Sequence, residues 1–155
     1  MTSSFTTTAT LAVSSSSFKN NGIIPVKYSC EGEQASPPLQ ITGIPEGTRS
    51  LALIVHDPDA PKVGGFTHWV MWNMDVNGTI PENFKGAVQG LNGKKETGYT
   101  GMCPPSGTHH YQFRVYALDA KLELDQHTDK AALEKAMKGH IIAQGDLVGL
   151  YQKTK

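Results

Sequence analysis

Residues 51–61 read Leu-Ala-Leu-Ile-Val-His-Asp-Pro-Asp-Ala-Pro, an unbroken apolar run followed at once by a polar, proline-rich turn. A strand that is covered on both faces carries apolar residues at successive positions, whereas a strand with one wet face alternates. The apolar run at 51–55 therefore predicts a strand in the interior of the molecule. The turn that follows places the carboxyl groups of Asp57 and Asp59 at the end of that strand.

Strand patterns recur on either side of this run. Residues 111–118 alternate along the chain, and residues 68–74 include aromatic and β-branched members that favour a strand. A final strand is expected over 141–151, in which Gly145 is a candidate bulge. Two shorter strands are predicted, one at 24–28 and one early in 41–47. Residues 78–107 are rich in glycine and proline and are predicted as loops.

One helix is predicted, close to the end of the chain. Thr128 can act as its N-cap, Asp129 suits the positive end of the helix dipole, and Gly139 ends it. Between them lies an apolar stripe formed by Ala132, Leu133, Ala136 and Met137. Many strands with one late helix predict a mainly β fold, a sandwich or barrel-like sheet with a helix on one side.

The length of 155 residues fits a single domain over 1–155, large enough to fold without crosslinks. Residues 1–17 are rich in Ser and Thr and are expected to form a ragged end or an edge strand. They hold no basic cluster and no apolar stretch long enough for a signal peptide or a membrane span. The sequence therefore predicts a cytoplasmic protein without stable membrane insertion.

The charges of the chain cancel, since 14 basic and 14 acidic residues give a formal net charge of zero. This balance provides no broad attraction for nucleic acid or for an anionic membrane surface, so no nucleic-acid partner is expected. Any binding of an anion must therefore depend on a local site.

Two cysteines, Cys30 and Cys103, form neither a disulfide framework nor a zinc motif. Both are expected to be reduced. A single bridge stays an alternative if the two residues lie close in space and the protein is exported.

Polar side chains concentrate in two segments that border predicted strands. The first is the turn at 57–61, with His68 opening the next strand, and the second is the segment 103–111. Prolines fix φ, so both segments are stiff for loops, and a stiff loop loses little entropy when it captures a ligand. Taken singly, each has a structural explanation, because Asp-Pro-Asp is a common turn and an isolated histidine is commonly a surface residue. That explanation is applied to His56, His127 and His140.

Taken together, these motifs resemble the phosphatidylethanolamine-binding protein family. The most specific is Asp57-Pro58-Asp59-Ala60-Pro61, directly after a buried strand. It is followed by His68 before an apolar strand, by Pro104-Pro105-Ser106-Gly107, and by His109-x-Tyr111. The resemblance covers about residues 18–151, and the short loop at 62–67 is most similar to the bacterial, Raf-kinase-inhibitor-like branch.

The resemblance implies a Greek-key β-sandwich, with a large central sheet, a smaller sheet on one side and a helix in the C-terminal region. It also implies a small pocket at one end of the central sheet that binds phosphate-like or carboxylate anions, without a metal or a cofactor. Its expected lining is Asp57, His68, Pro105, His109 and Tyr111, with Ala60 and Pro61 at the rim. The Ala60–Pro61 peptide bond is expected to be cis in this family.

One position departs from the family pattern. Members usually have arginine between the histidine and the tyrosine, where this chain has His110. Strand alternation turns residue 110 away from the face shared by His109 and Tyr111, so the replacement affects packing or a partner contact more than the pocket. In an alternative register His110 would itself be the ligand residue.

The leading hypothesis is a protein that binds a small anion without catalysing a reaction, in which Asp57 holds His68 or His109 as a hydrogen-bond donor. A second hypothesis is an acid/base hydrolase of phosphates or esters that uses the same residues. No serine or cysteine elbow supports it, and a His/His/Asp metal site lacks compact ligand spacing. A third hypothesis, by analogy with the family alone, is a regulator that docks on a kinase or a protease.

Overall fold

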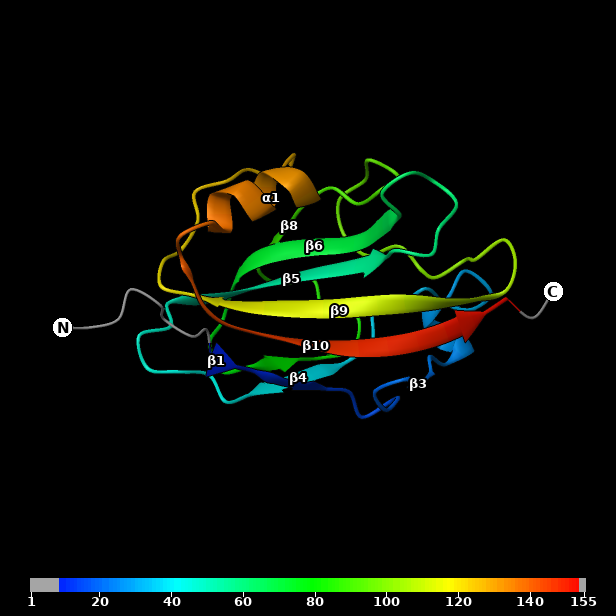
Figure 1. Ribbon diagram of the computed structural model, residues 1–155, viewed down its shortest axis with the longest axis horizontal. Helices are drawn as coiled ribbons and strands as arrows, with labels where there is room; N and C mark the ends of the chain where they lie inside the picture. The colour runs from blue at the N-terminus through cyan, green and yellow to red at the C-terminus, as the bar shows by residue number, and fades with distance from the viewer. Residues whose placement is uncertain (1–8, 154–155) are drawn as a thin grey trace.

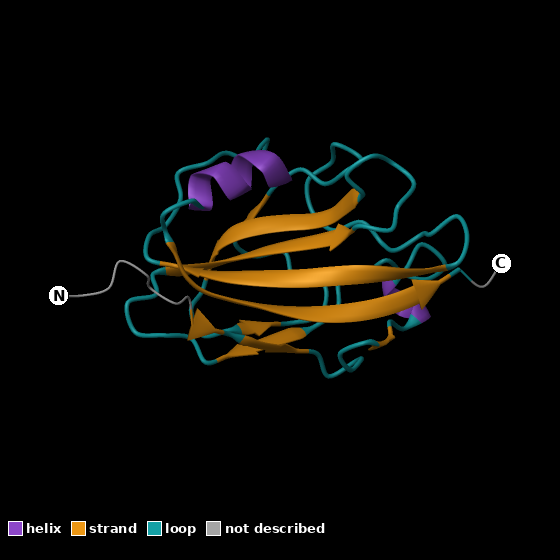
Figure 2. Cartoon of the chain, in the orientation of Figure 1, coloured by secondary structure: helices purple, strands orange, loops and turns teal. Residues whose placement is uncertain are grey.

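The larger of two sheets lies in the middle of the molecule, with the smaller sheet on one face and a helix on the other (Figure 1, Figure 2). The structure is a computed structural model that describes residues 9–153. In chain order the large sheet is formed by β1 (Ala9–Thr10), β3 (Gly22–Ile23), β5 (Ser50–Asp57), β6 (Phe66–Met74), β8 (Val88–Gln89), β9 (Thr108–Leu118) and β10 (Ile141–Gln152). The small sheet is formed by β2 (Ala12–Ser14), β4 (Leu39–Thr42) and β7 (Thr79–Ile80), and the helices are the short 3-10 helix η1 (Val26–Tyr28) and α1 (Lys130–Met137).

Four strands of the large sheet form a Greek key. β5, β6 and β8 lie side by side in chain order, and β9 returns over a long connection to pair with the other edge of β5. β10 then pairs antiparallel with β9 from Ile141 opposite Leu118 to Gln152 opposite Thr108. The predicted mainly β sandwich, with a smaller second sheet and a late helix, is confirmed.

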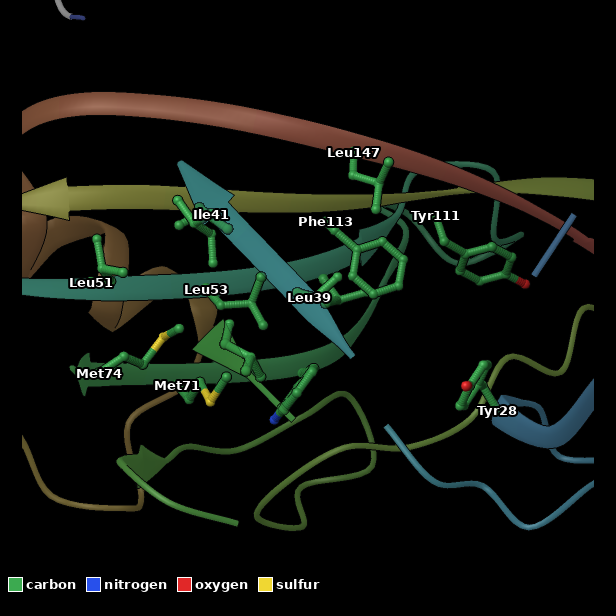
Figure 3. Close-up of a cluster of buried hydrophobic side chains, with 14 of the residues drawn as sticks. Tyr28, Leu39, Ile41, Leu51, Leu53, Met71, Met74, Tyr111, Phe113 and Leu147 are labelled. Atoms are coloured by element: carbon green, nitrogen blue, oxygen red, sulfur yellow. The ribbon is translucent and has the colours of Figure 1, made fainter. Parts of the chain in front are cut away.

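β5 occupies the centre of the large sheet, and its side chains alternate between two hydrophobic cores. Leu51, Leu53 and Val55 belong to the core between the two sheets, part of which Figure 3 shows. Ala52 and Ile54 belong to the core between the large sheet and α1. All five are at most 2% exposed, which accounts for the unbroken apolar run and confirms the prediction of a strand buried on both faces.

Two segments differ from the predicted elements. Residues 24–28 hold η1 instead of a strand, since Pro25, directly before it, has no N–H to give to a strand ladder. Residues 78–107, predicted as loops, contain β7 and β8, which are two residues long and leave no periodic pattern in the sequence.

The edge strand expected within 1–17 is present as two short strands. β1 lies at the edge of the large sheet and β2 at the edge of the small one, while residues 1–8 lie outside the described residues.

Gly145 is not a bulge, because the register between β10 and β9 shifts nearer the start of β10, between Ile141 and Ala143. The absence of a side chain at 145 has another physical reason. A Cβ atom there would lie 2.1 Å from the carbonyl oxygen of Leu11, where the N-terminal segment crosses β10. Glycine thus permits close approach of two backbones.

The helix predicted near the end of the chain is present as α1, but its N-cap is Asp129 and not Thr128. The carboxylate of Asp129 accepts a hydrogen bond from the main-chain N–H of Ala132 over 3.0 Å. Gly139, with φ of 86°, follows the end of the helix as predicted.

Replacing Asp129 with alanine should lower the free energy of unfolding by about 1 kcal/mol, because an N–H group of the first turn loses its acceptor. Asp129→Asn is the matched control, since its amide oxygen can accept the same hydrogen bond. Urea denaturation followed by circular dichroism measures both variants. Equal stability of Asp129→Ala and the unmodified chain would contradict this assignment of the cap.

Candidate functional site

The strand order brings the ends of three neighbouring strands together, at the right of the sheet in Figure 1. β5 ends at Asp57, and β6 and β9 both run antiparallel to it, so each begins beside that end. His68 lies near the start of β6, while His109 and Tyr111 lie near the start of β9. Residues that are far apart in the sequence therefore meet at one end of the sheet.

A cavity of about 280 Å³ opens at this end of the sheet. Its wall includes all seven residues that the family resemblance implied, namely Asp57, Ala60, Pro61, His68, Pro105, His109 and Tyr111. The remaining wall residues are Lys62, Phe66, Lys94, Gly101, Cys103 and Pro104. Since pockets for drug-sized ligands measure about 300–1,000 Å³, the volume suits a small ligand or a head group.

Two lysines of the wall were not anticipated from the sequence. Lys62 and Lys94 are exposed and lie in loops, where no local pattern distinguishes them from solvated surface lysines. They lie at the cavity because of the tertiary fold. In a chain with no net charge, their ammonium groups give the cavity wall a local positive field.

Asp57 and His109 form a buried pair in the wall. His109 Nδ1 donates to Asp57 Oδ2 over 2.6 Å, and the two side chains are 9% and 4% exposed respectively. Asp57 Oδ1 accepts a hydrogen bond from the main-chain N–H of Asp59 over 2.8 Å, so the turn holds the carboxylate in place. With Nδ1 engaged, Nε2 is the nitrogen that remains for a ligand. The histidine that Asp57 contacts is therefore His109 and not His68.

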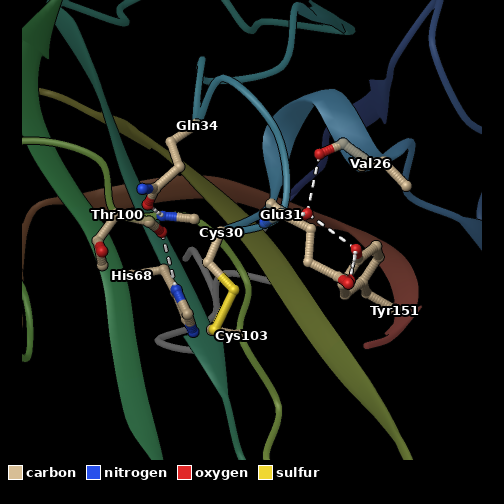
Figure 4. The surroundings of a disulfide bond; sticks show 10 residues. Val26, Cys30, Glu31, Gln34, His68, Thr100, Cys103 and Tyr151 are labelled. Atoms are coloured by element: carbon tan, nitrogen blue, oxygen red, sulfur yellow. Dashed lines mark hydrogen bonds between the residues drawn. A yellow bond between two sulfur atoms is a disulfide. The ribbon is translucent and has the colours of Figure 1, made fainter. Parts of the chain in front are cut away.

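His68 has a different partner, the main-chain carbonyl oxygen of Thr100, which lies 2.9 Å from Nδ1 (Figure 4). The residue is 5% exposed, and its ring packs edge-on against Phe66 and Tyr111 with centroid distances of 4.9 and 5.2 Å. This burial lowers the pKa of His68, although the Thr100 carbonyl acts in the opposite direction.

A bulge directs His68 into the cavity. Val55 pairs with Trp69, but the next residue of β5, His56, pairs with Thr67, so His68 is an extra residue in β6. In a regular strand His68 would share the face of Val70, which packs in the core beneath α1. The extra residue reverses the alternation at this point, as bulges beside functional sites commonly do.

The hydroxyl of Tyr111 is buried and has no hydrogen-bond partner among the described residues. A buried hydroxyl without a partner costs about 1–3 kcal/mol, so a ligand that supplied an acceptor would recover that energy. Burial raises the pKa of Tyr111, and the charges of Asp57 and Asp59 add to the effect. The phenol therefore keeps its proton throughout the neutral range and can act as a donor.

His110 points away from the cavity, as strand alternation predicts. Its Nδ1 and its main-chain N–H both lie 2.7 Å from Asp59 Oδ2, at the exposed surface. His110 therefore joins β9 to the turn after β5 and is not part of the cavity wall. The alternative register, in which His110 is the ligand residue, is wrong.

The expected cis bond is also wrong, because no peptide bond within 9–153 is cis and Ala60–Pro61 is therefore trans. The shape of this turn comes from other constraints. Asp57 accepts from the N–H of Asp59, and Gly65 has a φ of 81° and approaches the Asp57 carbonyl oxygen so closely that a Cβ would lie 2.3 Å from it. A side chain at 65 would push the turn away from β5.

Cys30 and Cys103 form a disulfide, with their Cα atoms 5.4 Å apart (Figure 4). The expectation of two reduced cysteines is wrong, because the fold brings together residues that are 73 positions apart in the chain. No local pattern in the sequence shows that proximity.

The disulfide anchors one side of the cavity. Next to it, the Cys30 N–H donates to the Met102 carbonyl over 3.0 Å, and the Gly101 N–H donates to Gln34 Oε1 over 3.1 Å. Gly101 and Cys103 belong to the cavity wall, and the neighbouring Thr100 holds His68. The disulfide and these bonds therefore fix the segment that positions His68.

Within residues 9–153, no group of three or more His, Cys, Asp or Glu side chains is placed to hold a metal ion. No helix in the same part of the chain has the length and hydrophobicity needed to cross a membrane.

A family model described as phosphatidylethanolamine-binding protein matches residues 14–152. The UPF0098 protein of Pyrococcus horikoshii is 49% identical over 150 residues, which cover 90% of this chain and 75% of that protein. The crystal structure of a phosphatidylethanolamine-binding protein homologue from Chlamydia trachomatis has a TM-score of 0.89 at 41% identity, covering 93% of this chain and 98% of the other. That of E. coli YbcL, a member of the mammalian family, has a TM-score of 0.87 at 33% identity, covering 94% and 100%.

Removing the disulfide by the double change Cys30→Ser and Cys103→Ser should lower the free energy of unfolding by about 4 kcal/mol. This is the chain-entropy value for a closed loop of 73 residues. Urea denaturation measures the change, and the unmodified chain with added reductant is the control that should match the double variant. Equal stability of the double variant and the oxidised chain would contradict a bridge in the folded protein.

Proposed function

Because the chain belongs to the phosphatidylethanolamine-binding protein family, we propose that the cavity at the end of β5 binds a small anion, such as inorganic phosphate, a phosphomonoester head group or a carboxylate. The observation that carries the proposal is the Tyr111 hydroxyl, which is buried, protonated and without an acceptor among residues 9–153. An oxyanion would provide that acceptor, and hydrogen bonds to ionised oxygens are stronger than those to neutral ones.

The negative charge of Asp57 is partly offset toward an anion in the cavity, because both of its oxygens accept hydrogen bonds from protein groups. Oδ2 accepts from His109 and Oδ1 accepts from the N–H of Asp59. Its proposed role is to fix the His109 ring so that Nε2 meets the ligand, as carboxylates do for metal-binding histidines. Positive charge at the mouth of the cavity comes from Lys62 and Lys94.

The hydrolase alternative has less support. The Asp57–His109 pair has the geometry of a general base, but Cys103, the cysteine of the wall, is held in a disulfide and has no thiol to act as a nucleophile. The wall as described includes no serine or threonine that could act as a nucleophile. The matching family model and the Pyrococcus relative carry no enzymatic name. We therefore propose binding and not catalysis.

Regulation of a kinase or a protease stays a prediction from the family resemblance. The surface that such a partner would share with the ligand is the exposed rim, which includes Pro105 and the His110–Asp59 pair. Because this rim borders the cavity, a bound anion would alter the surface that the partner meets.

The cytoplasmic location also stays a prediction, and the disulfide is the observation that weighs against it. Cytosolic thiol systems keep most cysteines reduced, whereas exported proteins retain their bridges. The bridge between Cys30 and Cys103 is therefore better suited to an oxidising compartment.

Tyr111→Phe removes the unpartnered hydroxyl and keeps the ring, so it should weaken the binding of inorganic phosphate by roughly tenfold. Isothermal titration calorimetry measures the affinity. The matched control is Tyr116→Phe on the same strand, whose ring packs in the core beneath α1. If Tyr111→Phe bound phosphate as well as the unmodified chain, the hydroxyl would have no role in the ligand site.

Asp57→Asn should weaken phosphate binding between about pH 5 and pH 8, because the His109 ring loses the carboxylate that fixes it. Asp75→Asn is a suitable control, since Asp75 is an exposed turn carboxylate that accepts from the N–H of Asn77. Phosphate titrations followed by NMR shifts of the imidazole signals report both affinity and ring environment. Tighter binding by Asp57→Asn over this range would mean that Asp57 repels the ligand and does not orient the histidine.

A further inference from the structure

The two imidazoles of the cavity wall differ in the group that holds them. His109 Nδ1 faces a carboxylate, that of Asp57, at 2.6 Å. His68 Nδ1 faces a neutral main-chain carbonyl, that of Thr100, at 2.9 Å. The first partner can balance a positive charge on its ring, whereas the second cannot. The two histidines are therefore not interchangeable toward a ligand.

The partner of His68 fixes its tautomer. A carbonyl oxygen can only accept, so the hydrogen bond requires the proton of the neutral ring to be on Nδ1. Nε2 then carries a lone pair and no hydrogen. Figure 4 shows Nδ1 facing Thr100, with the other ring nitrogen turned away from that carbonyl. Because His68 lines the cavity, this nitrogen is an acceptor in its wall.

The surroundings of His68 favour this neutral form. Burial, with Phe66 and Tyr111 against the ring, is the largest influence and lowers the pKa. His56 and Lys94 act in the same direction through their charges. The Thr100 carbonyl and the Asp57 charge oppose them without reversing the direction. The acceptor at Nε2 is therefore present in the neutral pH range.

A fully deprotonated oxyanion meets a conflict in this cavity. Its oxygens can accept from the Tyr111 hydroxyl, but any oxygen that reaches His68 Nε2 places one lone pair against another. An anion that keeps one acidic hydrogen avoids this conflict, because it can accept from Tyr111 and donate to His68. The wall thus offers a donor and an acceptor to the same small ligand.

We propose that the cavity selects anions that retain an acidic proton, such as the monoanion of a phosphomonoester, and that His68 Nε2 accepts the hydrogen bond from that proton. This selectivity rests on the anion-binding function proposed above. No proton is transferred, since the hydrogen stays on the ligand oxygen and His68 stays neutral. Phosphomonoesters lose their second proton at about pH 6, so the monoanion is abundant in mildly acidic solution.

Methyl phosphate and methyl sulfate form a matched pair of probes for this selection. At about pH 5 both are monoanions of nearly the same shape, but only methyl phosphate carries an acidic hydrogen. Methyl phosphate should bind at least roughly tenfold more tightly, because methyl sulfate leaves the buried acceptor facing another acceptor. The ratio of the two affinities should fall as the pH is raised to about 8, where methyl phosphate has lost that hydrogen. Titrations of protein groups other than His68 affect both ligands and largely cancel in this ratio.

The substitution His68→Gln tests the residue directly. The glutamine amide can turn an NH₂ group toward either ligand. The ratio of the affinities for methyl phosphate and methyl sulfate should therefore fall toward one. His56→Gln is the matched control, because the ring nitrogens of His56 are engaged by Thr67 and by the Gly64 carbonyl, and its side chain is not in the cavity wall. A measurement that needs no variant is ¹⁵N NMR of the imidazoles, which should show His68 protonated at Nδ1 alone, before and after methyl phosphate is added.

The outcomes separate this inference from the function on which it rests. A preference for methyl phosphate that disappears in His68→Gln supports it. Equal affinity for the two esters, or a His68 that is protonated at both nitrogens in the methyl phosphate complex, overturns it and leaves an anion site without selection for a proton. Failure of both esters to bind at any pH overturns the proposed function itself.

Discussion

The burial of β5 on both faces is the constraint on which the rest of the structure depends. A strand with apolar side chains at successive positions is stable only with a layer on each side, and the small sheet and α1 provide those layers. Because side chains alternate with a period of two, Asp57 lies on the same face as Leu53 and Val55, toward the core between the sheets. A carboxylate is thereby placed at the end of a buried face, where it requires a partner.

The same alternation supplies the partner. On β9, the neighbour of β5, His109 and Tyr111 lie on the same face as Phe113, which packs in the core between the two sheets. The antiparallel register sets the start of β9 beside the end of β5, which brings His109 into contact with Asp57. The site is thus an extension of the core, in which polar groups occupy the last positions of an apolar face and leave a cavity between them.

The sequence predicted the parts of the fold that depend on local pattern. The two-sided burial of β5, the alternating β9 and the end of α1 before Gly139 follow from periodicity and glycine chemistry. The disulfide and the lysines at the cavity were missed, because their positions depend on contacts between distant segments. The bulge that turns His68 inward was also missed, since an extra residue is defined only relative to the paired strand. The family resemblance nevertheless identified His68 as a wall residue. A motif marks which residue reaches the cavity, even when the strand pairing that directs it there cannot be read from the sequence.

Residue types alone do not determine what the cavity wall can recognise. His68 and His109 are the same amino acid at the same cavity, yet one is held by a main-chain carbonyl and the other by a carboxylate. The two partners come from different kinds of element, since Thr100 lies in a segment predicted as loop and Asp57 is the last residue of β5. The disulfide fixes the Thr100 segment by joining Cys103 to Cys30. For His68, the chemistry offered to a ligand is therefore set one contact behind the cavity wall, by the backbone and the crosslink that hold its ring, whereas His109 is held by a side chain of the wall itself.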